Sequence, residues 1–348
     1  MENTYLSGIA DYEDQEATFN GWVYNTRSVG KIWFLILRDG TGMTQCVVTR
    51  DNTTDDIFNL EKSLTQESSV SVTGVVKKEP RSVGGHEILV KNIVVHQVAE
   101  KYPITPKEHG TSFLMDHRHL WIRSKKQHAI LKIRHQVVKA CRNFLDNNGF
   151  ILIDAPIFTA NACEGTSNLF AVDYFERSAY LTQSGQLYSE ATAASFGKVY
   201  CFGPTFRAEK SKTRRHLTEF WMVEPEMAYY NLDDNMNLAE QFVEYIVQSC
   251  LKYCQPELKT LERDISKLEN VKAPFPRITY DEAAKTLEDQ GSDFTYGSDF
   301  GGTDETIISD QYDKPVMVHH WPAEVKAFYM KRDAENDNLA LGLDMLAP

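Results

Sequence analysis

The first hundred residues contain five short runs rich in β-branched and aromatic residues, interrupted by one helical pattern. The runs occupy residues 18–24, 31–38 and 43–48 before this pattern, and 69–76 and 87–95 after it. Asp39-Gly40-Thr41-Gly42 separates the second run from the third and is a strong hairpin turn. The helical pattern covers 51–67, with Ile57, Leu60 and Leu64 on one side. Three strands, a helix and two strands predict an all-β OB barrel, a fold whose open face binds single-stranded nucleic acid.

A second domain follows a polar connector that contains Pro103 and Pro106. We expect the barrel to span 1–100, a linker or hinge to span 101–117, and the second domain to span 118–348. Apolar side chains recur at helical spacing over 124–148, and residues 150–153 read as a buried strand that ends before Pro156. Further strand patterns lie at 179–182, 198–202 and 220–228, and a further helix at 238–253. These patterns predict an α+β domain built on a largely antiparallel sheet.

Composition and charge exclude several classes of protein. The 348 residues carry a net charge of −12 and contain no run of 18 apolar residues, so we expect no membrane span. The acidic first 30 residues are neither a signal nor a transit peptide, which favours the cytoplasm. The charge is unevenly distributed, because residues 101–139 hold nine Lys and Arg but only two Asp and Glu. This basic block indicates either a solvated hinge and helix face or a contact with a phosphate backbone.

A second basic segment lies within the acidic second domain. Residues 203–220 read GPTFRAEKSKTRRHLTEF, between two strand patterns. Six basic side chains fall within ten residues: Arg207, Lys210, Lys212, Arg214, Arg215 and His216. Such a cluster suits a polyanionic ligand, and guanidinium groups suit bidentate phosphate recognition. Taken alone, the segment is equally compatible with an ordinary basic surface loop.

Several motifs in this chain together resemble the class II aminoacyl-tRNA synthetases, in the asparaginyl branch of the aspartyl/asparaginyl subgroup. FRAE at 206–209 with RHLTEF at 215–220 resembles motif 2 of that class. The helix at 124–148 and the segment 150–156 resemble motif 1, the dimer-forming element. FLMDHRHLW at 113–121 resembles the entry to the catalytic domain of the whole subgroup. Four segments resemble the asparaginyl branch: QSGQLY at 183–188, EFWMVEPE at 219–226, ITYDEA at 278–283 and EVKAFYMK at 324–331. The resemblance covers residues 18–348 and implies an asparagine–tRNA ligase that acts as a homodimer.

The resemblance implies that ATP is a substrate and gives roles to the residues of motif 2. Arg207 would be the catalytic residue, holding the α-phosphate where negative charge develops in the transition state. Glu209 would accept a hydrogen bond from the adenine amino group, and Phe220 would stack on the adenine ring. The other implied ATP-binding residues are Arg215, His216 near the terminal phosphates and Leu217 at the ring edge.

The resemblance also implies an amino-acid pocket. Glu164 matches a mobile loop that closes over the α-amino group, and Ser184 and Gln186 match substrate-pocket positions. Ser189 stands where the aspartyl branch carries a lysine, and Glu224 stands where that branch carries an aspartate. A neutral carboxamide needs no lysine, and a glutamate can accept a hydrogen bond from its NH2 group. This favours asparagine as the substrate; an aspartyl or non-discriminating synthetase is the alternative.

In the barrel, Arg27, Phe34 and Gln45 match the positions that read the anticodon in this family. An aromatic platform, a guanidinium and an amide are the groups with which proteins recognise single-stranded RNA. The resemblance implies that this RNA partner is tRNA(Asn). Trp33 points to the opposite face from Phe34 if the strand alternates, so one of the two belongs to the barrel core.

The sequence departs from the family at its end. The family continues beyond the position of Pro348 into a metal-binding segment and motif 3, whose arginine clamps ATP. We therefore expect no metal ligand within 1–348 and expect Mg2+ to bind in the absent segment. We also expect the sequence to be a fragment, and the 348-residue chain alone not to activate asparagine. The alternative is a natural short paralogue, a non-catalytic module that binds tRNA or another RNA.

Overall fold

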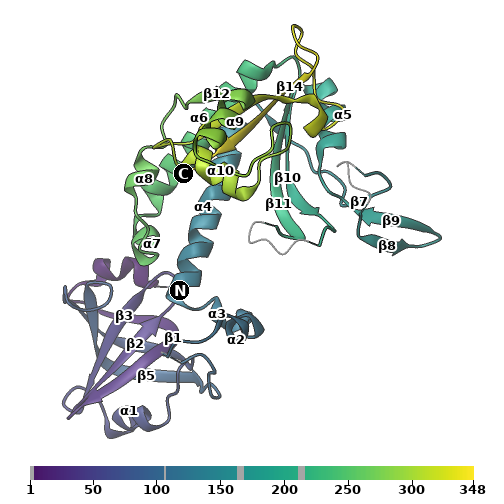
Figure 1. Ribbon diagram of the computed structural model, residues 1–348. Coiled ribbons are helices and arrows are strands. Elements are labelled where there is room, and N and C mark those ends of the chain that lie inside the picture. The colour runs from purple at the N-terminus through teal and green to yellow at the C-terminus, as the bar shows by residue number, and fades with distance from the viewer. Residues whose placement is uncertain (1–3, 106, 163–167, 211–215) are drawn as a thin grey trace. The chain divides into compact units, whose positions relative to one another are not determined.

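The structure is a computed structural model that describes residues 4–105, 107–162, 168–210 and 216–348 (Figure 1). The chain divides into two compact units, Met1–Trp121 and Ile122–Pro348. In the described part of the chain, no helix is long and apolar enough to cross a membrane.

The first unit is the closed five-stranded barrel that the order of its strand patterns predicts. Its strands pair in the order β1-β2-β3-β5-β4: β1 (Glu16–Val29), β2 (Ile32–Arg38), β3 (Met43–Thr49), β4 (Ser69–Lys78) and β5 (His86–Gln97). β1 pairs antiparallel with both β2 and β4, which closes the barrel. Alternation along β2 buries Trp33 completely and leaves Phe34 half-buried on the outer face, as predicted for this pair.

The helix between β3 and β4 is shorter than predicted. α1 (Asp55–Asn59) and the 3-10 turn η2 (Leu60–Lys62) replace the helix expected over 51–67. Thr54 caps α1 because its hydroxyl accepts a hydrogen bond from the amide of Ile57. The apolar side of the pattern was predicted correctly, since Leu64 is buried in the barrel core and the partly buried Ile57 and Leu60 pack against it. Phe58, which was not predicted, is buried there as well. The unit also contains η1 (Leu6–Tyr12), α2 (Thr111–Asp116) and α3 (Arg118–Trp121).

The second unit is the α+β domain expected from the sequence. β11 (Glu219–Met227), β10 (Lys198–Phe206) and β6 (Ile151–Leu152) form one sheet in that order. The second sheet contains β12 (Arg277–Thr279), β13 (Val316–Pro322) and β14 (Leu339–Leu346). The third sheet contains β7 (Phe158–Thr159), β9 (Arg177–Leu181) and β8 (Ala171–Tyr174). The two longest pairs, β10 with β11 and β13 with β14, are antiparallel.

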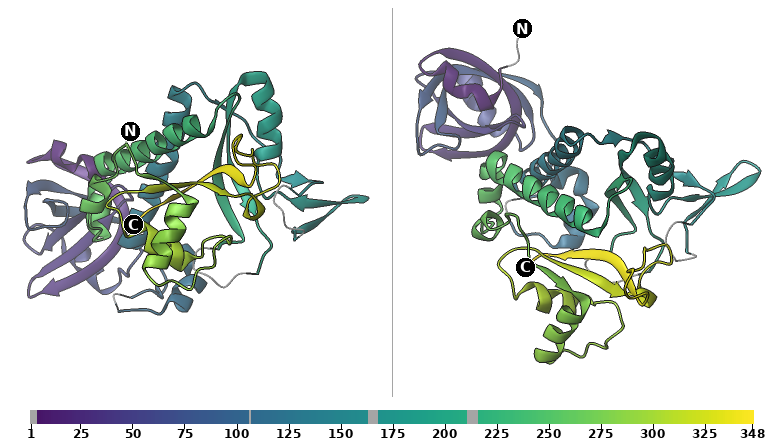
Figure 2. Two further views of the ribbon diagram at one scale, coloured as in Figure 1. Left: turned by 45° about the horizontal axis from the view of Figure 1, so that its top comes forward. Right: turned by 90° about the horizontal axis from the view of Figure 1, so that it is seen from above.

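The helices of this unit are α4 (Lys125–Asn147), α5 (Gln186–Phe196), α6 (Leu232–Tyr253), α7 (Gln255–Thr260), α8 (Ser266–Glu269), α9 (Tyr280–Asp289), α10 (Gly302–Ser309) and the 3-10 turn η3 (Ala323–Val325). α5 packs against β10 and β11, and α9 packs against β12 and β13. α6 packs beside α4 (Figure 2). Phe144 and Leu145 of α4 meet Phe150 and Tyr200 in a buried cluster, which fixes the position of β10.

The prediction of a buried strand at 150–153 is wrong for its two central residues. Phe150 is buried, but Ile151 and Leu152 are 44% and 37% exposed. They form β6, which pairs only with β10 among the described strands and is therefore an edge of its sheet. An edge strand has a neighbouring strand on one side only. Its apolar side chains are therefore less covered than those of a central strand.

Candidate functional site

One face of the β10–β11 pair gathers the residues that the sequence singles out. The register sets Cys201 opposite Glu224 and Thr205 opposite Phe220. Side chains alternate along a strand, so Phe220 and Glu224 lie on the same side of β11, about 13 Å apart. The opposite side of the pair carries Tyr200 into the buried core.

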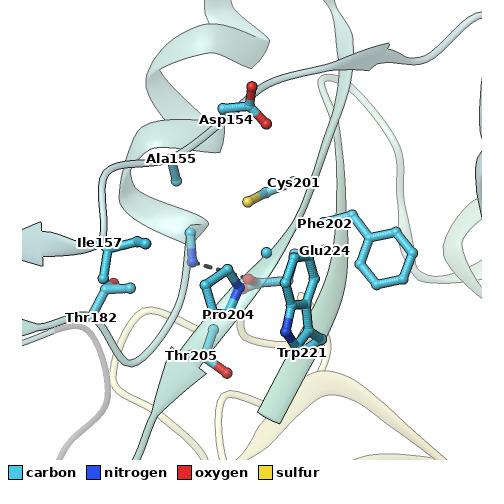
Figure 3. Close-up of a pocket in the computed structure, with 12 residues that line it drawn as sticks. Asp154, Ala155, Ile157, Thr182, Cys201, Phe202, Pro204, Thr205, Trp221 and Glu224 are labelled. Atoms are coloured by element: carbon cyan, nitrogen blue, oxygen red, sulfur yellow. Dashed lines mark hydrogen bonds between the residues drawn. The ribbon is translucent and has the colours of Figure 1, made fainter. Parts of the chain in front are cut away.

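A cavity of about 210 Å³ opens beside this face (Figure 3). Its lining comes from the segment before β7, the start of α5 and both strands, and includes Asp154, Thr182, Gly185, Cys201, Trp221 and Glu224. Carboxylates and a main-chain amide occur beside apolar surface in this cavity. The composition suits a small polar ligand whose orientation is set by a few hydrogen bonds.

Glu224 is held in place by the two residues that precede α5, Ser184 and Gly185. The hydroxyl of Ser184 donates a hydrogen bond to Oε2 of Glu224. The amide of Gly185 donates to Oε1 at 3.0 Å, the bond drawn in Figure 3. Ser184 Oγ in turn accepts from the amide of Gln186 at 3.0 Å. Both oxygens of Glu224 therefore have a fixed position at the cavity wall.

Gly185 is required by the close approach of α5 to the sheet. A Cβ atom at this position would lie 2.8 Å from Sγ of Cys201 and 3.3 Å from Cβ of Ala155. Any larger residue would push the start of α5 away from β10, because a sulfur atom cannot be approached to that distance without a shift. The glycine thus allows the amide at this position to reach Glu224.

A second hydrogen-bond chain links α5 to the segment before β14. Nε2 of Gln186 donates to Oε1 of Glu190 at 2.8 Å, and the hydroxyl of Tyr329 contacts Oε1 of Gln186 at 3.4 Å. Glu226 lies two residues after Glu224 on β11. The pKa of Glu226 is raised to about 7, chiefly by burial and in addition by the negative charges of Glu190 and Glu224.

The ends of β10 and β11 are hydrogen-bonded to each other where the loop that joins them begins. The amide of Arg207 donates to the carbonyl of Thr218 at 3.0 Å, and the guanidinium carbon of Arg207 lies 5.5 Å from the ring centroid of Phe220. The structure thus brings the predicted cation and the predicted aromatic platform together. Three further predicted residues lie in the described parts of this loop: the half-buried Glu209, and His216 and Leu217, which are exposed. Two predicted residues, Arg215 and Glu164, lie outside the described residues.

The outer face of the barrel brings the other three predicted residues into contact. Arg27 pairs with Phe34 across β1 and β2, and its guanidinium carbon lies 4.7 Å from the centroid of that ring. Nη2 of Arg27 donates to Oε1 of Gln45 at 3.4 Å. Nε2 of Gln45 is 3.3 Å from both Ser82 Oγ and Glu87 Oε2. The loop between β4 and β5 therefore helps to orient the amide of Gln45.

No group of three or more His, Cys, Asp and Glu side chains in the described ranges could hold a metal ion.

The sequence matches two family profiles. Residues 17–95 match an OB-fold nucleic acid binding domain, and residues 110–348 match the tRNA synthetases class II (D, K and N). The chain belongs to the class II tRNA synthetases. Its fold agrees with the membership, since the OB barrel and the α+β domain are the two units expected for this subgroup.

Two relatives of this synthetase are both named asparagine–tRNA ligase. The asparagine–tRNA ligase of Sorangium cellulosum (strain So ce56) is 56% identical over 355 residues, which cover 98% of this chain and 80% of the relative. The asparagine–tRNA ligase of Koribacter versatilis (strain Ellin345) is 57% identical over 349 residues, covering 98% and 79%. The chain thus spans about 80% of the length of these relatives.

Solved structures resemble this synthetase over its whole length. The asparaginyl-tRNA synthetase of Pyrococcus horikoshii, complexed with asparaginyl-adenylate, has a TM-score of 0.96 and 40% identity. That match covers 100% of this chain and 81% of the other. The aspartyl-tRNA synthetase of Entamoeba histolytica has a TM-score of 0.83 at 24% identity, a likeness of fold alone.

The sequence did not identify several residues that interact with the predicted site residues Gln186 and Glu224. Glu190 follows Gln186 by four residues on one helix, and Glu226 follows Glu224 by two on one strand, so spacing alone could have indicated both. Tyr329 gave no such signal, because its contact with Gln186 spans 143 residues of sequence.

Proposed function

We propose that this chain carries the active site of an asparagine–tRNA ligase. In the first step, a carboxylate oxygen of asparagine attacks the α-phosphorus of ATP and pyrophosphate leaves. In the second step, the 3′-hydroxyl of the terminal ribose of tRNA(Asn) attacks the acyl carbon of asparaginyl-adenylate and AMP leaves. Both steps depend on positioning and on stabilisation of developing charge, and neither needs a protein nucleophile.

The ATP site lies at the open end of β10 and β11. Arg207 binds the α-phosphate and stabilises the charge that develops there, while Phe220 stacks on adenine. Glu209 accepts from the adenine amino group, and Leu217 borders the ring. His216 and Arg215 approach the terminal phosphates.

The amino-acid site is the cavity beside Glu224. The single observation that carries the proposal is the fixed carboxylate of Glu224, held by Ser184 and Gly185 on the strand face shared with Phe220. A carboxylate with fixed oxygens accepts from the NH2 of a carboxamide and repels the carboxylate of aspartate. Gln186 and Glu164 complete the contacts to the amino acid.

Ser189, one turn after Gly185 on α5, also supports asparagine as the substrate. Its side chain is fully buried at the position where the aspartyl branch carries a lysine. Without a cation there, an aspartate side chain would lose its charge partner while it faces Glu224.

The barrel supplies the contact with tRNA(Asn). We propose that Phe34 stacks on an anticodon base, and that Arg27 and Gln45 read its edge. This contact is local, which is compatible with the net charge of −12 of the whole chain.

Mg2+ would enter the reaction bound to the ATP phosphates, which this ion prefers to all-protein cages. The residues that the structure describes offer no cluster of ligands for it.

We propose that two copies form a homodimer through α4 and β6. The apolar side chains of Ile130 and Leu131 on α4, and of Ile151 and Leu152 on β6, are exposed in the single chain. Such exposed apolar surface is typical of a protein interface. The molar mass in solution, measured by light scattering, tests this directly: two chains per particle are expected, and one would contradict it.

The proposed substrate is tested by equilibrium binding to this chain. Titration calorimetry compares sulfamoyl analogues of asparaginyl-adenylate and aspartyl-adenylate, with Glu288→Gln on the exposed side of α9 as a control variant. We expect the asparaginyl analogue to bind about 100-fold more tightly, since a site built for an amide rejects its isostere strongly. Equal affinities would contradict the assignment of asparagine, and a failure to bind either analogue would contradict a synthetase active site.

A further inference from the structure

The carboxamide of Gln186 is held at both of its ends. Its nitrogen donates to Glu190 at 2.8 Å, one turn further along α5. Its oxygen lies 3.4 Å from the hydroxyl of Tyr329, which comes from a segment 143 residues later in the chain. The two partners therefore reach the same amide from different elements.

These partners determine which end of the amide is which. A carboxylate only accepts hydrogen bonds, so the side facing Glu190 has to be the NH2 group. The other side is therefore the oxygen, which accepts a hydrogen bond from the phenol hydroxyl of Tyr329. Rotation of the amide by 180° would turn the carboxamide oxygen toward the carboxylate of Glu190, a repulsive arrangement.

The surroundings of Gln186 are acidic. The main-chain N–H of Gln186 donates to Ser184 Oγ, which is itself bonded to Glu224. Its side chain is bonded to Glu190, whose charge acts on Glu226 together with that of Glu224. Three carboxyl groups thus surround the start of α5. Of the polar groups of a free amino acid, the α-ammonium is the one that such a field attracts.

We infer that Glu190 is a positioning residue, which with Tyr329 holds the carboxamide oxygen of Gln186 toward the α-ammonium group of the bound amino acid. This inference rests on the proposed function, because it requires Gln186 to contact the amino acid. Glu190 acts through Gln186, one turn away on the same helix. If Glu190 is lost, no carboxylate opposes rotation of the amide, and the phenol of Tyr329 can accept from its NH2 group as well as donate to its oxygen. The amide then presents its NH2 group to a cation for part of the time.

The test compares two ligands that differ only in the ammonium group. One is the sulfamoyl analogue of asparaginyl-adenylate, and the other is its des-amino counterpart, in which hydrogen replaces the α-ammonium. Affinities are measured by calorimetry for the wild-type chain and for Glu190→Met, Glu190→Gln and Tyr329→Phe. Glu288→Gln serves as the matched control, since it removes an exposed carboxylate on α9.

Glu190→Met should weaken the amino-bearing analogue about 10-fold, the scale of one hydrogen bond to a charged group. It should leave the des-amino analogue within about two-fold of wild type, since that ligand has no cation for the Gln186 oxygen. Glu190→Gln keeps an acceptor for the amide and should restore most of the loss. Tyr329→Phe should weaken the same analogue selectively, and the control should change neither.

Equal losses for both analogues in Glu190→Met would overturn the inference, because a general disturbance of the pocket does not distinguish the ammonium group. Unchanged binding of both analogues would overturn it as well. If the wild-type chain bound neither analogue, the proposed function itself would fail, which is a separate outcome from either of these.

Discussion

The main-chain amide of Gly185 donates a hydrogen bond to Oε1 of Glu224 at 3.0 Å, across 39 residues of sequence. This bond joins the start of α5 to the middle of β11. It fixes the carboxylate that we assign to substrate recognition, and it depends on a glycine at the point of closest approach to Cys201.

Glu224→Gln should narrow the discrimination between asparagine and aspartate. The amide that replaces the carboxylate removes the charge that repels aspartate. Its NH2 group also adds a hydrogen-bond donor to the cavity wall. We expect the asparaginyl-adenylate analogue to lose about 10- to 100-fold in affinity, the scale of a hydrogen bond to a charged group. The aspartyl analogue should improve. Calorimetry measures both, and an unchanged ratio of affinities would argue against a role of Glu224 in specificity.

Gly185→Ala should lower the free energy of unfolding by about 1–3 kcal/mol, the usual cost of an extra methyl group in a packed site. The new Cβ would approach Sγ of Cys201 to 2.8 Å. Cys201→Ala removes that sulfur atom, so the same glycine substitution should cost less in the Cys201→Ala background. Urea unfolding of the four proteins gives both values. Equal costs in the two backgrounds would mean that the strain arises elsewhere.

Trp33 and Phe34 form a matched pair for the barrel. Trp33 is fully buried, so Trp33→Ala should lower the stability of the barrel by about 3–5 kcal/mol. Phe34→Ala should leave stability nearly unchanged but weaken an anticodon stem-loop of tRNA(Asn) by about 1–3 kcal/mol, the value of one stacked base. Fluorescence anisotropy with labelled RNA measures this binding. A Phe34→Ala chain that binds the RNA normally would show that the anticodon does not stack there.

Glu226 should make stability depend on pH. Its pKa is raised from 4.5 to about 7 in the folded chain, chiefly by burial, so the folded state binds the proton more tightly than the unfolded state. The wild-type chain therefore loses stability as pH rises from 4.5 through 7. Glu226→Gln cannot ionise, so its melting temperature should exceed that of the wild type by an increasing margin over this range. A margin that is the same at pH 5 and pH 8 would contradict the raised pKa.

Much of the fold follows from local pattern. The barrel was predictable because alternation in the runs 31–38 and 43–48 and the turn at Asp39-Gly40-Thr41-Gly42 are local signals that the tertiary structure reinforces. The helix at 51–67 was predicted too long, because apolar spacing does not reveal that a turn precedes Asp55 or that a 3-10 turn begins at Leu60. The exposure of Ile151 and Leu152 was missed for a related reason: an apolar run does not distinguish an edge strand from a central one.

The site was predictable only in part. Arg207 and Phe220 come together because they flank one loop. That loop was predictable, since it lies between two strand patterns that are close in the sequence. The orientation of the Gln186 amide was not predictable, since it depends on Tyr329, which only the folded chain brings near. The close approach of Gly185 to Cys201 is likewise a property of packing between α5 and β10, not of any local pattern.

The most direct test of the account is the charging of a tRNA(Asn) transcript with asparagine and, side by side, with aspartate. The product of the whole reading frame is assayed with ATP, and kcat/KM is compared for the two amino acids. We predict that asparagine is preferred by about 100-fold or more, as expected for a site built around one carboxamide. Charging with aspartate at a comparable rate would contradict the central claim that this active site selects asparagine.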